Sequence, residues 1–503
     1  MTGLLARVPL LVLLAGILSA SMYIPAVHAL LRDAHAEARA FFYWGTMLLA
    51  IIAAVSVAIS RHRSTNVTRS HLVALLATFV ALPAVAALPL GEILPATRWI
   101  NLYVEMVAAL TTTGGSLYLP DRLSETAHLW RGLVAWQGGL MIWVAAVAIL
   151  APLRLGGFEV THSADSVSER GLGIMRAADP EVRLMRHAAT LVPIYAGLTA
   201  LLWALLVAAG EAPTPALIHA MSTLATSGIS ADGSLVAADA GRWGELAIFA
   251  FLFFAVSRQT FTADLHPEQV VRLTQDREMR IAVLIVVSVT LALFARHWIG
   301  AFGVDAITDI GAALRALWGS AFTVLSFLTT TGFQSADWAA TRTWSGLETP
   351  AVLLVGLAMF GGGVATTAGG VKLLRIYALY AHGRREMNLL VHPHSIAGGR
   401  GAHRHIKSRG IEAAWIFFML YALTVAAFTL GLTATGLDFG ASVIMATAGL
   451  STTGPLAQVA GIDAQGLNGL PDATKAVWAA AMVVGRLETL ALIALFNPDF
   501  WRN

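Results

Sequence analysis

Hydroxyl-bearing residues followed by glycine recur four times along this 503-residue chain. The sequence reads LTTTG at 110–114, LATSG at 224–228, LTTTG at 328–332 and LSTTG at 450–454. Glycine permits positive φ or a close approach of backbones, so such a segment can turn successive carbonyl oxygens to one side. Rings of carbonyls replace the water shell of a cation, and threonine hydroxyls add oxygen ligands. Without carboxylates, this oxygen set suits a monovalent alkali cation better than Ca²⁺ or Mg²⁺.

One Thr-Thr-Gly after an apolar helix is explained equally well by a helix that ends with glycine at C′. That explanation is insufficient for four copies, each placed after a short apolar segment and between long ones. We therefore predict that the last four residues of each copy form a selectivity filter. The predicted filter comprises Thr111, Thr112, Thr113, Gly114, Ala225, Thr226, Ser227, Gly228, Thr329, Thr330, Thr331, Gly332, Ser451, Thr452, Thr453 and Gly454.

The composition indicates the elements that must position these residues. Hydrophobic residues make up 57% of the chain and charged residues 13%, too few to cover a soluble core of this size. Cysteine is absent from the sequence, which excludes disulfides, thiolate metal sites and cysteine nucleophiles. The basic residues are explained as cytoplasmic anchors, and no pattern favours nucleic-acid binding.

Ten apolar stretches are long enough to span a bilayer as helices. They are 3–24, 40–60, 71–90, 130–152, 188–209, 243–262, 279–298, 350–380, 411–433 and 475–496. Four shorter apolar stretches directly precede the glycine segments and fit re-entrant half-helices; they are 100–110, 214–224, 315–328 and 438–449. We predict an all-α polytopic membrane protein with four helix–pore-loop–helix repeats around one central pore, plus two extra N-terminal transmembrane helices.

Arginines cluster after each repeat and before the first, which by the positive-inside rule makes those segments cytoplasmic. The glycine segments then open toward the outside, and both termini lie in the cytoplasm. Two termini on one side require an even number of spans, which agrees with the ten counted. The predicted parts are an N-terminal two-helix domain and four repeats, at 1–66, 67–170, 171–275, 276–405 and 406–503.

A glycine-rich stretch interrupts the predicted span at 350–380. Glycine and threonine disfavour helix, and a break inside a membrane is tolerated where it lines a cavity. We predict a flexible loop below the filter that blocks ions; close helix packing through small residues is the alternative. The predicted gate residues are Gly361, Gly362, Gly363, Thr366, Thr367, Gly369 and Gly370.

Charged residues inside the membrane are costly and face protein or water. Arg486 is predicted to raise the barrier to cations below the filter; an ion pair with Glu488 that locks helices is the alternative. Lys372 is predicted to extend to the cytoplasmic interface. Glu105, in the first short helix, either braces the filter or attracts cations. The histidines of 381–409 are interpreted as part of a solvated basic loop, not a metal site.

Several stretches resemble the Trk/Ktr/HKT superfamily of potassium transporters, closest to its bacterial TrkH-type branch. They include LSFLTTTGFQSADW at 325–338, GGGVATTAGGVKLLRI at 361–376 and GRLETLALIALFNPDFWR at 485–502. The resemblance implies K⁺ as the ion, a gate at the glycine-rich loop and an arginine in the pore. It also implies a homodimer in the bacterial inner membrane, among lipids, controlled by a cytoplasmic nucleotide-binding subunit of the TrkA type. The fourth segment, STTGPLAQ, departs from the Asn-containing, Gly-Pro-Gly form of that family.

Alternative functions place different demands on the sequence. A potassium symporter driven by H⁺ or Na⁺ needs a titratable residue in the path, for which Glu105 and Glu488 are the candidates. A less selective K⁺/Na⁺ channel is a further alternative, because of the departure at the fourth segment. The chain lacks HExxH and GxSxG, which argues against an enzyme. It contains no nucleotide-binding fingerprint, so we expect no organic cofactor.

Overall fold

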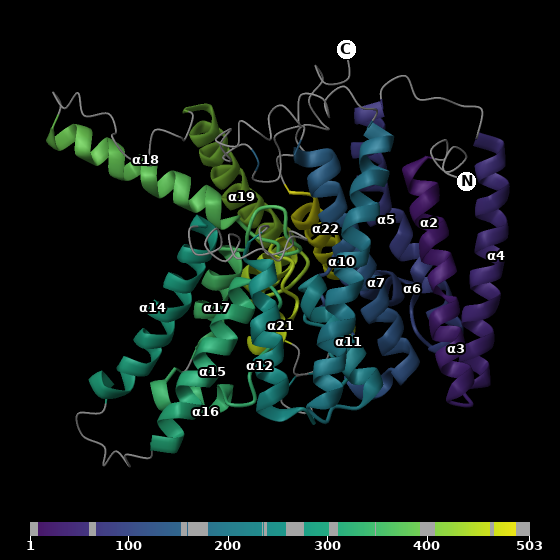
Figure 1. Ribbon diagram of the computed structural model, residues 1–503, viewed down its shortest axis with the longest axis horizontal. Helices are drawn as coiled ribbons and strands as arrows, with labels where there is room; N and C mark the ends of the chain where they lie inside the picture. Colours follow the sequence, from purple (N-terminus) through teal and green to yellow (C-terminus); the bar gives the residue numbers. More distant parts are fainter. Residues whose placement is uncertain are drawn as a thin grey trace.

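The computed structural model describes residues 9–59, 67–151, 158, 180–233, 235, 239–257, 276–300, 310–347, 349–392, 408–462 and 467–488. Within these ranges every regular element is a helix (Figure 1). The predicted all-helical class is confirmed. The predicted part boundaries at 66, 170, 275 and 405 lie in, or at the edges of, segments outside the described residues.

The helices follow the predicted order of two leading elements and four units. The leading elements are α2 (Leu10–Ser21) with α3 (Tyr23–Leu31), and α4 (His35–Ile59). The units, each a long helix, a short helix and a second helix, are α5 (Val67–Ile93), α6 (Trp99–Leu110) and α7 (Glu125–Ala145); α10 (Pro180–Ala208), α11 (Pro213–Ala225) and α12 (Gly241–Leu252); α14 (Arg277–Gly300), α15 (Ile310–Leu328) and α17 (Pro350–Met359); α19 (Ser408–Ala434), α20 (Phe439–Leu450) and α22 (Asp472–Leu487). Three further helices are α16 (Trp338–Ser345), α18 (Leu373–Val391) and α21 (Pro455–Val459).

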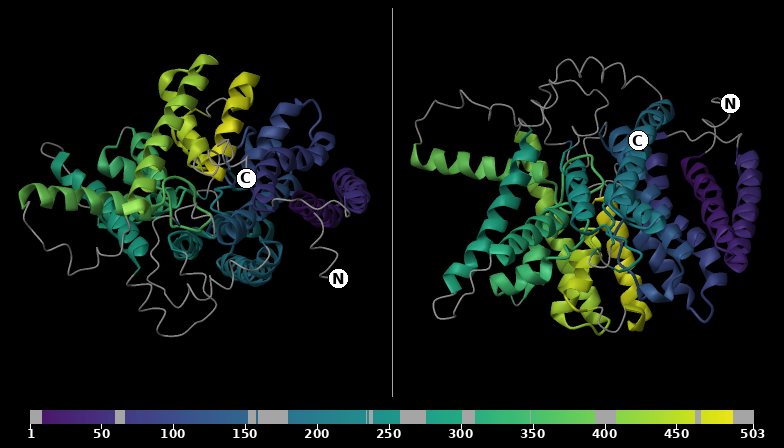
Figure 2. Two further views of the ribbon diagram at one scale, coloured as in Figure 1. Left: turned by 90° about the horizontal axis from the view of Figure 1, so that it is seen from above. Right: turned by 60° about the horizontal axis from the view of Figure 1, so that its bottom comes forward.

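The short helices α6, α11, α15 and α20 organise the packing. In each unit the short helix packs against both flanking helices. The second helix of each unit also packs against the short helix of the next, through α7 with α11, α12 with α15, α17 with α20, and α22 with α6. The last of these contacts returns to the first unit, so the four units form a closed ring (Figure 2).

Eight helices within the described residues have the length and apolar composition of membrane spans. Seven of them correspond to predicted spans, and the eighth, Ile310–Leu328, is the third predicted half-helix. The predicted spans at 243–262 and 475–496 begin as α12 and α22 and then leave the described residues. The span at 350–380 is divided into α17 and α18, because the glycine-rich stretch separates them.

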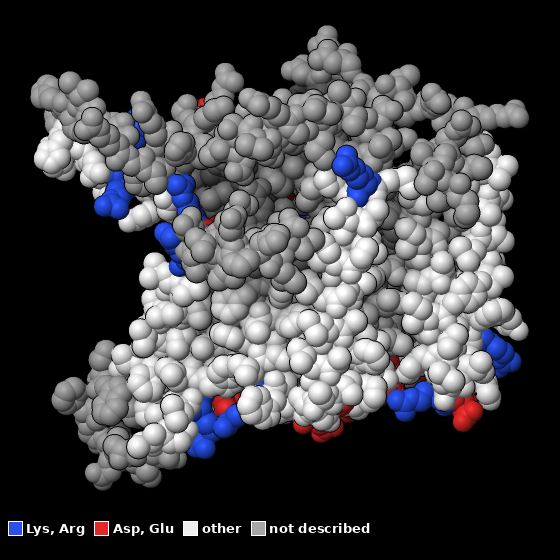
Figure 3. All heavy atoms as spheres, in the orientation of Figure 1, with Lys and Arg blue, Asp and Glu red and all other residues white. Residues whose placement is uncertain are grey.

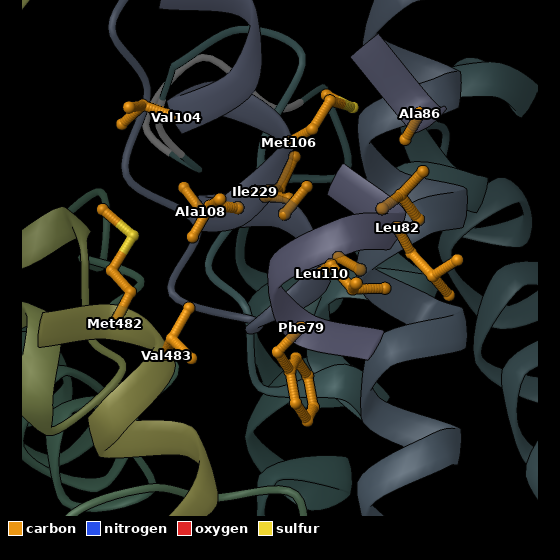
Figure 4. Packing of buried hydrophobic residues seen from close by; sticks show 14 of the residues in the cluster. Phe79, Leu82, Ala86, Val104, Met106, Ala108, Leu110, Ile229, Met482 and Val483 are labelled. Atoms are coloured by element: carbon orange, nitrogen blue, oxygen red, sulfur yellow. The ribbon is translucent and has the colours of Figure 1, made fainter. Parts of the chain in front are cut away.

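The short helices are buried at their C-terminal ends, as helices enclosed by protein must be. On α6, every residue from Leu102 to Leu110 is buried apart from Tyr103. Figure 4 shows Met106 and Leu110 of α6 in the same apolar cluster as Leu82 of α5 and Met482 of α22. On the face that Figure 3 shows, the described residues form a broad band without charged side chains above a lower edge that carries charges of both signs.

Two features lie outside the ring. Helices α2, α3 and α4 pack against one another and against α5 and α7 of the first unit. Helix α18 projects from the body toward the upper left of Figure 1. It continues to Val391, so the prediction of a loop from residue 381 was wrong: residues 381–391 are helical, and 393–407 lie outside the described residues.

Candidate functional site

In each glycine segment, the threonine two positions before the glycine has a positive φ, which is uncommon for this residue type. The φ values are 55° at Thr112, 52° at Thr226, 60° at Thr330 and 54° at Thr452. Positive φ in a β-branched residue is a genuine outlier that persists only where the surroundings impose it, and such outliers cluster at functional sites. The sequence pattern predicted positive φ or close approach at the glycines, and it did not indicate positive φ at these threonines.

A second shared feature explains how the segments turn. The amide of the residue before glycine donates to a short-helix carbonyl five residues earlier in all four copies. The N···O distances are 2.9 Å for Thr113 to Ala108, 2.9 Å for Ser227 to Ser222, 2.9 Å for Thr331 to Ser326 and 2.8 Å for Thr453 to Ala448. Because these amides face back toward the short helix, the segments are free to present oxygen atoms elsewhere.

The first three segments are in direct backbone contact. A β-carbon on Gly114 would lie 1.6 Å from the carbonyl oxygen of Ser227 in the second segment. A β-carbon on Gly228 would lie 2.1 Å from the carbonyl oxygen of Thr331 in the third. Gly114 and Gly228 also have positive φ, 74° and 67°. Glycine is therefore required at both positions for conformation and for space.

The fourth segment completes the ring and differs from the others. A β-carbon on Gly332 would lie 2.9 Å from Cγ of Pro455, and the amide of Gly454 donates to the Thr113 carbonyl at 2.6 Å. Gly114, Gly228 and Gly332 have positive φ, whereas Gly454 has φ −58°, so only the second of the two roles expected of these glycines applies to Gly454. Here glycine is needed for close approach, since a β-carbon would lie 2.1 Å from the Gly115 amide nitrogen.

The ring is lined with hydroxyl groups that are shielded from solvent. In the first and third segments, the hydroxyl three residues before glycine forms a hydrogen bond with the hydroxyl one residue before it. The O···O distances are 2.8 Å for Thr111 with Thr113 and 3.1 Å for Thr329 with Thr331. Among the described residues, the buried hydroxyls of Thr112 and Thr452 have no hydrogen-bond partner. Buried polar atoms without partners call for an explanation, and a dehydrated cation would satisfy them.

Buried polar side chains brace the first segment. Glu105 forms an ion pair with Arg131 of α7 at 2.6 Å, and both side chains are almost fully buried. The same carboxylate accepts bonds from the Ser116 hydroxyl at 3.1 Å and the Leu117 amide at 2.8 Å, just beyond Gly114. Of the two roles considered for Glu105, the contacts are those of a brace.

The second and third segments have braces that the sequence analysis missed. His219 occupies the position of Glu105 in α11; one ring nitrogen contacts Glu211 and the other lies 2.8 Å from the Ser230 hydroxyl. In the third unit Glu245 of α12 accepts bonds from the Ser335 hydroxyl at 2.9 Å and the Ala336 amide at 2.6 Å. Glu105 and His219 each lie nine residues before the glycine of their segment, a signal that an alignment of the repeats contains. Glu245 lies in the preceding unit and carries no such signal.

We expect Arg131→Met to destabilise the protein, because it leaves the Glu105 carboxylate buried without a counter-charge. Removing one partner of a buried ion pair typically costs about 3–5 kcal/mol. Thermal unfolding of the detergent-solubilised protein measures the loss. Arg32→Met is the matched control, since Arg32 and Glu125 form an exposed pair, worth about 0–1 kcal/mol. Equal losses in the two variants would contradict the bracing role.

The predicted gate residues lie in an irregular stretch, 360–372, between α17 and α18, and all of 361–370 is buried. The amide of Gly369 donates to the Thr330 hydroxyl at 2.9 Å, and the Thr367 hydroxyl donates to the carbonyl of Leu224, near the end of α11, at 3.1 Å. On its other side the amide of Val364 donates to Glu278 of α14 at 2.8 Å. This stretch therefore packs directly against the ring.

Arg486 contacts the gate stretch and not Glu488. Its Nη1 donates to the Thr367 carbonyl at 2.6 Å, and its Nε and Nη2 have no hydrogen-bond partner among the described residues. Glu488 instead pairs with Arg375 at 2.8 Å, so the alternative of an Arg486–Glu488 lock is wrong. Lys372 is also buried and donates to the Ala368 carbonyl; the prediction that it reaches the interface was wrong.

Comparison with known proteins places this arrangement in a family. The family profile of TrkH, described as a cation transport protein, matches residues 39–502. The chain belongs to the TrkH family. Its membership of this family places it among membrane transport proteins and not among enzymes, as predicted.

Relatives and a solved structure extend the TrkH likeness over the whole chain. The Trk system potassium uptake protein TrkH of Salmonella typhimurium is 30% identical over 495 residues, 98% of each chain. The Trk system potassium uptake protein TrkI of Halomonas elongata is 30% identical over 436 residues, which are 85% of this chain and 82% of TrkI. The crystal structure of the potassium transporter TrkH from Vibrio parahaemolyticus matches with a TM-score of 0.81, at 28% identity, over 100% of both chains.

Proposed function

We propose that the chain is the membrane subunit of a potassium uptake system and conducts K⁺ through the ring of four glycine segments. The observation that carries the proposal is the repeated geometry: Thr112, Thr226, Thr330 and Thr452 all adopt positive φ in a closed ring without carboxylates. Backbone and hydroxyl oxygens are the ligands that dehydrated K⁺ requires. The printed descriptions of the relatives, Trk system potassium uptake proteins, support K⁺ as the ion.

The stretch from Gly361 to Gly370 is the gate of this pathway. It is supported by its contacts with the second and third segments, through Leu224 and Thr330. Arg486 holds the stretch at the Thr367 carbonyl and places a positive charge beside it. Both effects oppose the passage of a cation. The gate opens when the stretch withdraws from the ring.

The assembly follows the family resemblance. The subunit is a homodimer in the lipid bilayer of the bacterial inner membrane, with both termini in the cytoplasm. A nucleotide-binding subunit of the TrkA type controls it from the cytoplasmic side. The five parts predicted from the sequence are its N-terminal domain and four pore repeats.

A symporter driven by H⁺ or Na⁺ is the second candidate. It requires a titratable group that exchanges protons in the path. Glu105 and Glu488 are both engaged in ion pairs, with Arg131 and Arg375. The buried pair of His219, in α11, and Glu211, just before this helix, is a further titratable candidate beside the second segment. These pairings favour conduction driven by the K⁺ gradient alone.

K⁺ flux into proteoliposomes tests the two candidates. We expect net K⁺ movement to follow the K⁺ gradient and to reverse with it, at unchanged H⁺ and Na⁺ gradients. The measurement is made with and without a TrkA-type subunit, because the isolated subunit is expected to be largely closed. K⁺ uphill movement driven by an imposed H⁺ or Na⁺ gradient would contradict the channel and support the symporter.

A further inference from the structure

The fourth glycine segment leads directly into a short helix, unlike the other three. Helix α21 begins at Pro455, immediately after Gly454. The conformation of Gly454, φ −58° and ψ −38°, is right-handed helical, which a residue before proline normally avoids because its β-carbon and the proline ring collide. Glycine has no β-carbon, so this position tolerates both the helical conformation and the following proline.

This helix occupies the oxygen atoms that the fourth segment would offer to a cation. The Leu456 amide donates to the Thr453 carbonyl at 3.1 Å, and the Ala457 amide donates to the Gly454 carbonyl at 3.0 Å. At the positions equivalent to Gly454, the carbonyls of Gly114, Gly228 and Gly332 accept no hydrogen bond from the described part of the chain. The difference is confined to the glycines, since the Thr113 carbonyl also accepts a bond, from the Gly454 amide. A backbone carbonyl oxygen has two lone pairs, and the hydrogen bond within the helix takes one of them, so a single lone pair is left for an ion.

The proline ring also fills the space beside the other glycines. A β-carbon on Gly228 would lie 2.7 Å from Cγ of Pro455, and one on Gly332 would lie 2.9 Å from it. Pro455 therefore stands against the second and third segments, where its ring presents carbon instead of oxygen. Pro455 has no amide hydrogen, so it donates no bond to either segment.

We infer that the ring is three-sided at its glycine end and that Pro455 and α21 are the determinants of ion selectivity there. The inference rests on the proposed K⁺ pathway. Discrimination between K⁺ and Na⁺ depends on the number and field strength of the coordinating carbonyls. With three free glycine carbonyls, a cation at this level has fewer oxygen ligands on the side of the fourth segment, and the preference of the site for K⁺ over Na⁺ is reduced.

The K⁺/Na⁺ permeability ratio of two variants tests this inference. Ala457→Pro removes the amide that occupies the Gly454 carbonyl, and Pro455→Gly releases the start of α21. We expect either change to raise the ratio about three- to tenfold, the factor that corresponds to one hydrogen bond. Ala457→Gly is the matched control, because it changes the side chain and keeps the amide; we expect the ratio to rise less in this variant than in Ala457→Pro.

Two outcomes of the flux measurement overturn the inference. One is an unchanged ratio in both variants while K⁺ flux persists; the other is an equal rise in Ala457→Gly. Anomalous scattering from Rb⁺ in crystals of the wild-type protein gives a readout that needs no variant. We expect Rb⁺ closer to the carbonyls of Gly114, Gly228 and Gly332 than to that of Gly454. Rb⁺ equidistant from all four overturns the three-sided site, whereas Rb⁺ absent from the ring overturns the proposed pathway itself.

Discussion

Gly114→Ser is expected to lower the preference for K⁺ over Na⁺ by at least about tenfold, equal to about 1.4 kcal/mol. The new β-carbon would lie 1.6 Å from the Ser227 carbonyl oxygen, so the first and second segments must separate. The serine would also adopt φ 74°, a conformation that costs of order 1–3 kcal/mol. The measurement is competitive K⁺ and Na⁺ flux in proteoliposomes.

Gly346→Ser separates the effect of crowding from that of backbone strain. Gly346 has φ 60° and follows α16, with no atom within 4 Å of the position of an added β-carbon. The substitution therefore imposes similar strain with no contact to the ring. We expect a modest loss of stability and an unchanged ion preference. If Gly114→Ser leaves the ion preference unaltered, the first glycine segment does not bind the ion.

Arg486→Ala is expected to raise K⁺ flux through the isolated subunit. The substitution removes the bond to the Thr367 carbonyl and the positive charge beside the gate stretch. A hydrogen bond to a charged group contributes about 1.5–3 kcal/mol, so the loss raises the rate about tenfold or more. Flux without a regulatory subunit measures the change, because gating by a partner would mask it.

Arg486→Lys is the control for this prediction, since it keeps the charge and shortens the donor. We expect its flux to lie between those of the wild type and Arg486→Ala. Thermal unfolding verifies that each variant is folded. If Arg486→Ala conducts no faster than the wild type, then Arg486 does not close the pathway, and its role is to stabilise the buried stretch.

The helices could be predicted well from the sequence because the same pattern of segments occurs four times. Four short apolar segments before four glycine segments predicted α6, α11, α15 and α20 to within a few residues. The break at 360–372 was also predictable, since glycine and threonine there disfavour helix in an otherwise apolar stretch. The binding and gating roles of these segments remain predictions.

The features that the sequence did not predict depend on contacts between distant segments. Lys372 is buried because the chain folds it beneath the gate stretch, which hydropathy does not reveal. Glu245 braces a segment of the next unit, 90 residues away along the chain from Ser335. Helix α21 was not predicted either. It begins at Pro455 and depends on Gly454, because only glycine readily adopts the helical conformation directly before proline. Contacts between residues so far apart along the chain cannot be predicted from local composition.

Silver block of a single cysteine in the ring tests the central claim most directly. The chain contains no cysteine, so Thr112→Cys introduces the only thiol, at a buried hydroxyl without a hydrogen-bond partner in the described part of the chain. A thiolate binds soft monovalent metals tightly. We predict that Ag⁺ blocks K⁺ flux in this variant, that K⁺ slows the block, and that Val352→Cys on the exposed face of α17 is insensitive. Flux through Thr112→Cys that Ag⁺ leaves unchanged would contradict an ion pathway through the ring.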